Sequence, residues 1–465
     1  MNKRERYKRL FRFFNALIII GLLTAAFAYM WYENFANNKE LLIKTFFQRG
    51  NYALVVLYAV TMLLFYRTYG AHEVGRMRAM ESAYTQVLSV LCTNAFAYLQ
   101  MCLIGRWKFL SNIQPILWLT LVDIVLVILW TMVARFAYIK IYPPKKVLLI
   151  YGKYNPKSMI EKMSSRQDKY IIHSVINIDR GMEEVKRRID SCQNVLLMEL
   201  PAEEREELLT YCFRKNIRCY SELNLSDIMI RNSEEIHLFD TSLLLFRNAG
   251  LSADQQFLKR AFDVVFSFLF LVLTSPIMLI IAIAVKLCDG GPVFFVQERL
   301  TRDGKVFKLY KFRSMYINKE ETGYCLTRQN DKRVTPVGKI IRDIHFDELP
   351  QIFNILKGDM SFVGPRPECP DLAEEYRQIV PEFDFRLKMK AGLTGYAQVY
   401  GKYNTTPLDK LKLDLEYIQR YSFWLDLKLI LLTVKILFQK ENTEGIKDWQ
   451  TTAATAESLE NIGKK

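Results

Sequence analysis

Residues 264–285 read VVFSFLFLVLTSPIMLIIAIAV, and this uncharged stretch of 22 residues decides how the chain meets a membrane. Its length suffices for one helical span, which takes about 20 residues. Ser275-Pro276 falls in the middle, and a proline inside a helix removes one hydrogen bond and clashes with the preceding turn. Because Ser-Pro can end one helix and start another, each half would be about 15–18 Å long and too short to cross alone. We therefore predict a re-entrant hairpin over 259–287, with a kinked ordinary span as the alternative.

Four further apolar segments stand near the start of the chain, at about 13–32, 52–66, 84–104 and 115–134. Each approaches the ~20 residues of a helical span, the second only with its flanks. Lys and Arg residues are dense in 1–12 and follow the fourth segment over 135–146. Because cytoplasmic flanks carry an excess of such residues, we predict four transmembrane helices over 1–142 with both flanks in the cytoplasm.

The formal net charge of +15 indicates an anionic partner, which could be nucleic acid, an anionic membrane or a phosphorylated substrate. No nucleic-acid-binding motif is recognisable, so we expect no nucleic-acid partner. The eight cysteines show no CxxC spacing, which argues against a disulfide framework or a zinc site.

After Pro143-Pro144 the pattern changes to that of an α/β domain, which we place at 143–250. Strand-like segments at 146–151, 170–176, 195–198 and 217–220 alternate with helical ones. Such alternation predicts a parallel, doubly wound, Rossmann-like sheet. The first strand-to-helix turn has only Gly152, whereas a dinucleotide site needs several glycines for close approach to the pyrophosphate. We therefore expect a packing, regulatory or assembly role for this domain.

Asp347-Glu348 are adjacent carboxylates in a stretch rich in Lys and Arg. A basic surround favours the ionised form of both. One carboxylate can then attack the phosphorus of a phosphate ester while the other holds a divalent metal. The simpler alternative is that Asp347 is a helix N-cap, with Pro350 in the first turn of that helix.

Residues 364–368 carry Arg366 between two prolines, which restrict the backbone. A guanidinium on a stiff loop loses less entropy when it grips a phosphate, and it can do so bidentately. Thr335-Pro336 predicts the N-cap and first residue of a helix that runs through Arg342 toward the acidic pair. Solvated basic surface is the alternative for any one of these features.

Residues of about 255–440 resemble the bacterial sugar transferases, the monotopic polyprenyl-phosphate glycosyl-1-phosphate transferases. The resemblance rests on motifs in order along the chain: KRAFD at 259–263, Ser275-Pro276, GPVFF at 291–295, KFRSM at 311–315, DELPQ at 347–351, KGDMS at 357–361, GPRPE at 364–368 and GLTG at 392–395. The whole chain is similar to the larger members, in which four spans and a Rossmann-like domain precede the transferase module.

The resemblance implies a reaction in two steps. Asp347 attacks the β-phosphate of a UDP-sugar and UMP leaves; undecaprenyl phosphate in the membrane then takes the sugar-1-phosphate. Glu348 is implied as the ligand of Mg²⁺. The candidates for contacts to the phosphates or the uridine are Lys311, Arg313 and Arg366, with Asp414 as a further polar candidate.

Five positions depart from the pattern of the family. Thr301 stands where glycine is usual, Ala391 replaces a proline and Lys402 an arginine, while His345 and Phe346 replace small polar and leucine residues. None is part of the acidic pair, so the departures concern the sugar pocket or the stiffness of loops. His345 is interpreted as a surface or packing residue rather than a general base.

The expected protein is thus a multi-pass enzyme of the bacterial inner membrane with its catalytic part in the cytoplasm. A four-helix bundle (1–142) and the Rossmann-like domain (143–250) precede a mainly α transferase module (251–440) and a polar tail (441–465) predicted to be disordered. Segment 423–438 is either an amphipathic helix on the membrane surface or part of the core.

The expected partners are a UDP-sugar, undecaprenyl phosphate and the lipid bilayer, with a homodimer or other polysaccharide-assembly proteins also possible. The resemblance implies that the enzyme starts the assembly of an exopolysaccharide, capsule or O-antigen. UDP-glucose and UDP-galactose are the first candidate donors, before N-acetylated sugars. A membrane scaffold or nucleotide-sensing regulator of polysaccharide machinery is the alternative function.

Overall fold

The computed structural model describes residues 7–36, 48–105, 107–152, 156–246, 250–316, 333–401 and 405–437. Lys402 and the predicted disordered tail therefore lie outside the described residues. The chain forms two compact units, Met1–Glu222 and Leu223–Lys465.

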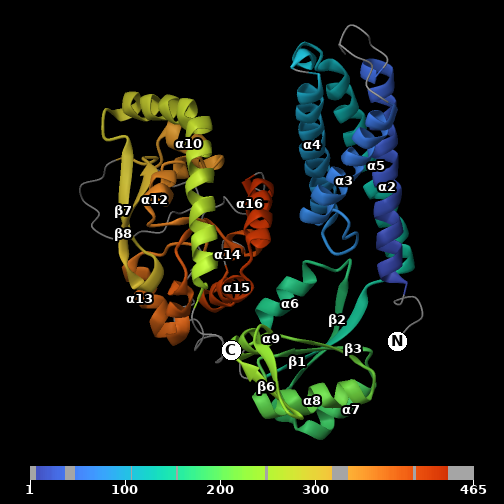
Figure 1. Cartoon of the computed structure of the whole chain (residues 1–465). Coiled ribbons are helices and arrows are strands. Elements are labelled where there is room, and N and C mark those ends of the chain that lie inside the picture. Colours follow the sequence, from blue (N-terminus) through green and yellow to red (C-terminus); the bar gives the residue numbers. More distant parts are fainter. Residues whose placement is uncertain are drawn as a thin grey trace. The chain divides into compact units, whose positions relative to one another are not determined.

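The first unit begins with four long helices that pack against one another (Figure 1). They are α2 (Lys8–Trp31), α3 (Gln48–Thr68), α4 (Ala79–Ile104) and α5 (Gln114–Ile141). A π-helical turn, Tyr32–Ala36, extends α2, and a 3₁₀ turn, Lys108–Ser111, precedes α5. All four helices are long and apolar enough to cross a membrane, so the predicted apolar helices are confirmed.

Polar side chains inside this bundle join three of its helices. Tyr58 on α3 donates a hydrogen bond of 2.8 Å to Asn94 on α4, and the Asn94 amide donates one of 3.0 Å to Asp123 on α5. Asp123 is fully buried. Buried polar groups require such partners, so this contact restricts how the three helices can pack.

The rest of the first unit is a four-stranded parallel sheet in the order β2-β1-β3-β4. Its strands are β1 (Lys145–Tyr151), β2 (Tyr170–Asn177), β3 (Asn194–Met198) and β4 (Arg218–Ser221), and its helices are α6 (Lys157–Ser164), α7 (Met182–Asp190) and α8 (Ala202–Arg214).

Alternate residues of β1 face opposite sides of this sheet. Leu148 and Ile150 pack with residues of α7 and α8, whereas Val147 and Leu149 pack with residues of α6. The sheet is thus covered by helices on both faces, and the predicted doubly wound domain is confirmed.

The second unit starts with α9 (Leu225–Arg231), the antiparallel hairpin of β5 (Glu234–Leu238) and β6 (Thr241–Leu245), and the long helix α10 (Ala253–Asp289). A second antiparallel hairpin follows, made of β7 (Phe294–Leu300) and β8 (Val306–Phe312).

Beyond β8 the second unit is mainly helical. It contains α11 (Pro336–Asp343), α12 (Gln351–Lys357), α13 (Pro370–Ile379), α14 (Tyr396–Tyr400), α15 (Pro407–Gln419) and α16 (Phe423–Leu437), with β9 (Ser361–Val363) and β10 (Gly392–Thr394) paired in parallel. One core contains side chains of α9, β8, α12, β9, α13, α15 and α16, and a smaller one joins α11 to α10 and β8.

Helix α10 is continuous through Ser275-Pro276 and turns sharply along its length (Figure 1). We predicted that this dipeptide ends one helix and starts another; it instead lies inside a single bent helix. Pro276 lacks the N–H of a helical hydrogen bond, which explains the bend. Helix α10 is the fifth helix of the described residues that is long and apolar enough to cross a membrane.

Helix α16 packs on the core through one side. Leu429 and Leu432 are buried, whereas Trp424 is 77% exposed. The structure therefore favours core packing for this segment, the second of the two predicted alternatives, with Trp424 outside the core.

Candidate active site

Asp347 and Glu348 lie in a 3₁₀ turn, Phe346–Glu348, between α11 and α12. Helix α11 begins as predicted, because the Thr335 hydroxyl accepts a hydrogen bond of 2.9 Å from Gly338 N. It ends at Asp343, and His345 follows with a left-handed φ of 57°. The N-cap of α12 is Pro350, so the N-cap interpretation of Asp347 is wrong.

Two cations converge on one oxygen of Glu348. Lys311 Nζ lies 2.7 Å from Glu348 Oε1, and Arg366 Nη2 lies 3.3 Å from the same atom. Burial alone would raise the pKa of Glu348, but the charges of Lys311 and Arg366 outweigh it and hold this pKa well below its usual value. Glu348 is therefore ionised throughout the physiological pH range.

Asp347 differs from its neighbour in its ionisation. Burial raises the pKa of Asp347, the charge of Lys311 lowers it, and the charge of Glu348 raises it again, so that the net shift is upward. The two carboxylates are thus adjacent in sequence but unequal, as is expected for groups with different tasks.

Asn354 fixes the strand that carries Lys311 against the helix that follows the acidic pair. Its side chain is fully buried, accepts a hydrogen bond of 3.1 Å from Tyr310 N and donates one of 2.7 Å to Lys308 O. This residue was not predicted from the sequence, although a lone asparagine among the apolar residues of α12 is a signal that could have found it.

The loop that carries Arg366 follows β9 and lies beside β10. Gly364 N donates to Thr394 O at 2.8 Å. A Cβ atom on Gly364 would lie 2.3 Å from Lys390 O, and one on Gly392 would lie 2.1 Å from Gly364 N. Only glycine permits this close approach of the two backbones, which places the Arg366 side chain against Glu348.

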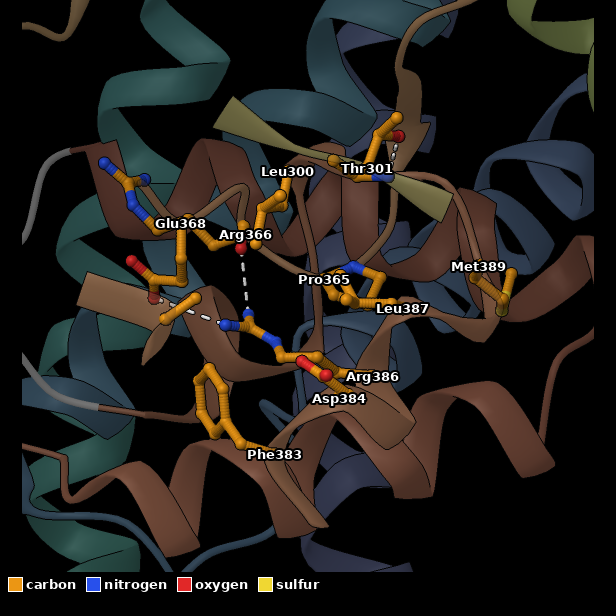
Figure 2. A pocket seen from close by; sticks show the side chains of 12 residues that line it. Leu300, Thr301, Pro365, Arg366, Glu368, Phe383, Asp384, Arg386, Leu387 and Met389 are labelled. Carbon is orange, nitrogen blue, oxygen red and sulfur yellow. Dashed lines mark hydrogen bonds and ion pairs between the residues drawn. The ribbon is translucent and has the colours of Figure 1, made fainter. Parts of the chain in front are cut away.

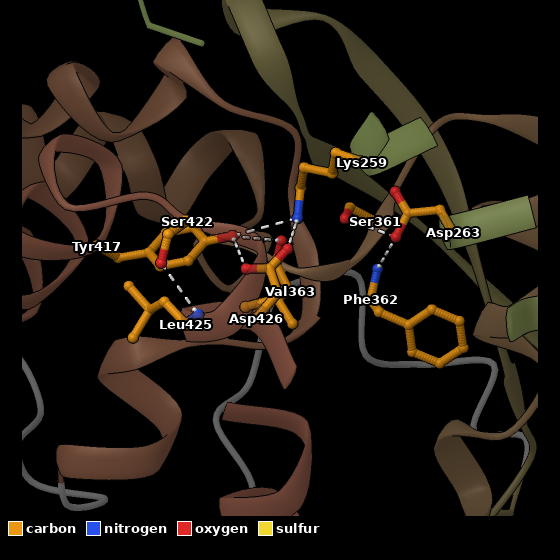
Figure 3. Close-up of polar contacts among 9 residues, drawn as sticks. All are labelled: Lys259, Asp263, Ser361, Phe362, Val363, Tyr417, Ser422, Leu425 and Asp426. Carbon is orange, nitrogen blue, oxygen red and sulfur yellow. Dashed lines mark hydrogen bonds and ion pairs between the residues drawn. The ribbon is translucent and has the colours of Figure 1, made fainter. Parts of the chain in front are cut away.

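Helix α10 contacts the elements that carry both sides of the site. Arg260 donates two hydrogen bonds of 2.6 Å to Ile355 O and Leu356 O, at the carboxyl end of α12. Asp263 accepts hydrogen bonds from the Ser361 hydroxyl at 3.0 Å and from Phe362 N at 3.1 Å, on β9 (Figure 3).

A buried ion pair adds to this anchor. Lys259 Nζ lies 2.6 Å from Asp426 Oδ2 of α16 (Figure 3). The Tyr417 hydroxyl, which has one proton, lies 2.7 Å from Asp426 Oδ1 and 3.1 Å from Val363 O. The predicted KRAFD motif at 259–263 therefore joins the apolar helix to β9, α12, α15 and α16.

Of the predicted substrate-contact residues, Lys311 and Arg366 meet at the acidic pair and two others do not. Arg313 is 6% exposed and pairs with Asp289 at the end of α10. Asp414 is 1% exposed and forms an ion pair of 2.8 Å with Arg386. Both are internal charges whose paired partners are protein groups rather than an open surface.

The acidic pair suits a magnesium ion in the chemistry of its donors. Mg²⁺ prefers oxygen ligands and is commonly held by one or two carboxylates, substrate phosphates and water. Glu348 provides an ionised carboxylate with Asp347 beside it. No group of three or more His, Cys, Asp or Glu side chains suited to a metal occurs among the described residues, so phosphate and water oxygens would have to complete the shell.

The fold and this site define a membrane-associated protein with an acidic pair embedded in cationic residues. Comparison with known proteins adds the family: residues 254–440 match the bacterial sugar transferase family. A relative from Caulobacter vibrioides, a UDP-glucose:undecaprenyl-phosphate glucose-1-phosphate transferase, is 39% identical over 211 residues, which cover 43% of this chain and 78% of that protein. The chain belongs to the bacterial sugar transferase family.

Two other relatives are longer than the region that they share with this chain. A UDP-glucose:undecaprenyl-phosphate glucose-1-phosphate transferase of Escherichia coli K12 is 46% identical over 189 residues, 40% of this chain and 41% of that protein. A UDP-N-acetylgalactosamine-undecaprenyl-phosphate N-acetylgalactosaminephosphotransferase of Aeromonas hydrophila is 36% identical over 239 residues, 51% of this chain and 56% of that protein. The chain thus spans about half the length of these relatives.

Proposed function

We propose that this protein transfers a sugar-1-phosphate from a UDP-sugar to undecaprenyl phosphate, releases UMP and so starts the assembly of a surface polysaccharide. The observation that carries the proposal is Asp347 beside Glu348, with Lys311 and Arg366 converging on that glutamate. Membership of the family and the names of the relatives from Escherichia coli and Aeromonas hydrophila support it.

In the first step, a carboxylate oxygen of Asp347 attacks the β-phosphorus of the UDP-sugar. The bond from this phosphorus to the oxygen that bridges the two phosphates breaks, and its electron pair leaves on that oxygen as part of UMP. The sugar-1-phosphate is then bonded to Asp347 as an acyl phosphate. Covalent catalysis of this kind divides one difficult transfer into two easier ones.

In the second step, a phosphate oxygen of undecaprenyl phosphate attacks the same phosphorus. The bond between that phosphorus and Asp347 breaks, and its electron pair returns to the carboxylate. The products are the diphosphate-linked lipid sugar and the original enzyme, so no oxidant or reductant is needed.

Lys311 and Arg366 would neutralise charge on the diphosphate. The Lys311 side chain is 21% exposed and that of Arg366 is 50% exposed, so both can exchange a contact with Glu348 for one with a phosphate oxygen. Glu348 is the residue that would hold Mg²⁺, which when bound supplies positive charge to the departing phosphate.

The bent α10 helix supports a re-entrant arrangement, in which both of its ends return to the cytoplasmic face of the inner membrane. Its anchoring residues 259–263 contact the catalytic elements directly. A site held in this way lies at the membrane surface, where a soluble nucleotide sugar and a lipid phosphate can both reach it.

The test is UMP release by purified protein with magnesium, undecaprenyl phosphate and a panel of UDP-glucose, UDP-galactose and their N-acetylated counterparts. Asp347→Asn should reduce the rate with the best donor by about 10⁴-fold or more, because the nucleophile is lost. Asp343→Asn, an exposed carboxylate four residues earlier, is the matched control and should keep the wild-type rate. Equal UMP release by the wild type and Asp347→Asn would exclude the mechanism, whereas no UMP release by the wild type with any donor would favour a scaffold role.

A further inference from the structure

The loop that carries Arg366 is held through its carbonyl groups. Because Pro365 and Pro367 lack an N–H, the loop has few donors of its own. Four consecutive carbonyls each accept a hydrogen bond: Pro365 O from Gly392 N at 2.9 Å, Arg366 O from Arg386 Nη2 at 2.9 Å, Pro367 O from Arg299 Nη1 at 3.1 Å and Glu368 O from Leu300 N at 2.9 Å. Of these donors, only Arg386 contacts Arg366 itself.

Arg386 is fixed in place by buried charges. Its side chain is 3% exposed and forms ion pairs with Asp414 Oδ2 at 2.8 Å and with Glu368 Oε1 at 3.3 Å. It also lies over the Phe383 ring, 4.9 Å from the centroid. A buried arginine paired on two sides has little freedom to move, so it is a rigid support for the carbonyl that it contacts.

Figure 2 shows the Arg386 guanidinium between the Glu368 carboxylate and the Arg366 carbonyl, with the Arg366 side chain extending away from it. Arg386 thus contacts the carbonyl group of Arg366, while the Arg366 side chain extends in another direction and reaches Glu348. Lysine has a single side-chain nitrogen, so it cannot contact Glu368 from one nitrogen and Asp414 and the Arg366 carbonyl from another, as Arg386 does.

We propose that Arg386 is a positioning residue, which holds the Arg366 backbone so that the Arg366 guanidinium points at the acidic pair and at the phosphates of the nucleotide. Its described contacts are with Glu368, Asp414, Phe383 and the Arg366 carbonyl, and none of them is with the acidic pair. This inference rests on the proposed function, because Arg366 is given the role of binding the diphosphate.

The experiment is a double-mutant cycle on full-length protein with Arg386→Lys and Arg366→Ala. It is read out in kcat/KM for UMP release and in the affinity for UDP measured calorimetrically with magnesium chloride. Arg386→Lys should lower both values by about tenfold to a hundredfold in the wild-type background, as expected when a binding group is misplaced by about 1 Å. In the Arg366→Ala background it should cause almost no further loss.

Arg377→Lys is the matched control. Arg377 pairs with Asp384 on the same 3₁₀ segment (Pro381–Lys388) that carries Arg386, and its side chain is 31% exposed. This substitution should change neither value. If Arg386→Lys does not fold, Asp414→Asn loosens the same guanidinium with a smaller change and should show the same dependence on Arg366.

Equal losses of kcat/KM and UDP affinity in the wild-type and Arg366→Ala backgrounds would mean that Arg386 only stabilises the fold, and would overturn the inference. Wild-type values of both quantities for Arg386→Lys would also overturn it. Wild-type protein that binds UDP but releases no UMP would overturn the proposed function alone, because the cycle can still be completed by calorimetry. Wild-type protein that does not bind UDP would overturn both.

Discussion

Two residues that depart from the pattern of the family, Thr301 and Ala391, are partners in one hydrogen bond. Ala391 N donates to Thr301 Oγ1 at 3.2 Å, and the Thr301 hydroxyl donates to Asp359 O at 2.8 Å. A proline at 391 would have no N–H to donate, and a glycine at 301 would have no hydroxyl to accept it. At the scale of the residue, the two departures therefore belong together, because the N–H that Ala391 adds is satisfied by the hydroxyl that Thr301 adds.

We expect Thr301→Gly to lower the free energy of unfolding by about 1–3 kcal/mol, because the buried Ala391 N–H loses its acceptor. Adding Ala391→Pro removes that donor, so the double variant should lose less than the sum of the two single variants. The midpoints of thermal unfolding of the four proteins in detergent measure this difference. Additive losses would show that the two residues are independent.

Asp414 gives the second unit a pH dependence of stability. Burial raises the pKa of its carboxyl from 3.8 to about 6, against the opposing charge of Arg386. Between about pH 4 and pH 6 the folded protein therefore holds this proton more tightly than the unfolded chain does. The stabilisation that this carboxyl contributes is complete below about pH 4, decreases as the pH rises from 4 to 6, and does not change further above pH 6.

Asp414→Asn should remove this decrease in the free energy of unfolding between pH 4 and pH 6, which corresponds to about 3 kcal/mol for two pKa units. The difference between the unfolding midpoints of the variant and the wild type (variant minus wild type) should thus increase from pH 4.5 to pH 6. Glu368, whose pKa the nearby cations hold at about 2 despite its burial, loses its contribution only on acidification below about pH 4.5. A midpoint difference that stays constant from pH 4.5 to pH 7 would contradict the assignment to Asp414.

At the scale of elements, α10 has two tasks along its length. Residues 259–263 bind the catalytic elements through charged side chains, and the apolar part beyond them contains Ser275-Pro276, to which we attribute the bend. A straight helix of 37 residues would be about 55 Å long, longer than a bilayer core of about 30 Å, so the bend decides where its end lies.

Cys288, near the carboxyl end of α10, should react with a membrane-impermeant maleimide only from the cytoplasmic face. The measurement uses a variant in which the other cysteines are replaced by serine, in inverted vesicles and in spheroplasts. A re-entrant α10 places Cys288 on the cytoplasmic side, and Pro276→Ala should reduce that labelling because it restores the helical hydrogen bond.

Leu110→Cys in a background in which all eight cysteines, Cys288 included, are replaced by serine is the control for the opposite face. Leu110 lies between α4 and α5, is 57% exposed, and should react only in spheroplasts. Labelling of Cys288 from the periplasmic side would show that α10 crosses the membrane.

At the scale of the whole molecule, the second unit has its own core and contains the acidic pair with all of its described partners. Its first helix belongs to that core: Ile228 of α9 is 4% exposed, and Asn232 donates a hydrogen bond of 3.0 Å to Gln419. The relative from Caulobacter vibrioides, of which 78% aligns with this chain, consists largely of the matching region. We therefore expect that the first unit is not needed for the chemistry.

A fragment of residues 223–465 should retain most of the UMP-releasing activity of the full chain. A fragment that starts at residue 246 lacks Ile228 and should be less stable by about 2 kcal/mol or more, as for the loss of other buried aliphatic side chains. Thermal unfolding and UMP release by both fragments check this prediction. Equal stability of the two would show that α9 is dispensable.

Much of the fold followed from local patterns. The four apolar helices of the first unit, its parallel sheet and the start of α11 are determined by hydrophobic periodicity and by a Thr-Pro cap, which act over a few residues. The acidic pair with Lys311 and Arg366 was predicted by resemblance and by charge. The burial of Arg313 and Asp414 was not predicted, because a sequence does not show which charges lie inside the fold.

The sequence by itself determined which segments are apolar, which residues can carry the phosphate chemistry and to which family the motifs are similar. Only the tertiary structure decided that Ser275-Pro276 lies inside one bent helix, that Asp347 lies in a 3₁₀ turn, and that Arg386, Asn354 and residues 259–263 contact the elements that carry the site. The physical reason is distance along the chain: Lys259 and Asp426 are 167 positions apart, and such a contact exists only once the intervening chain has folded.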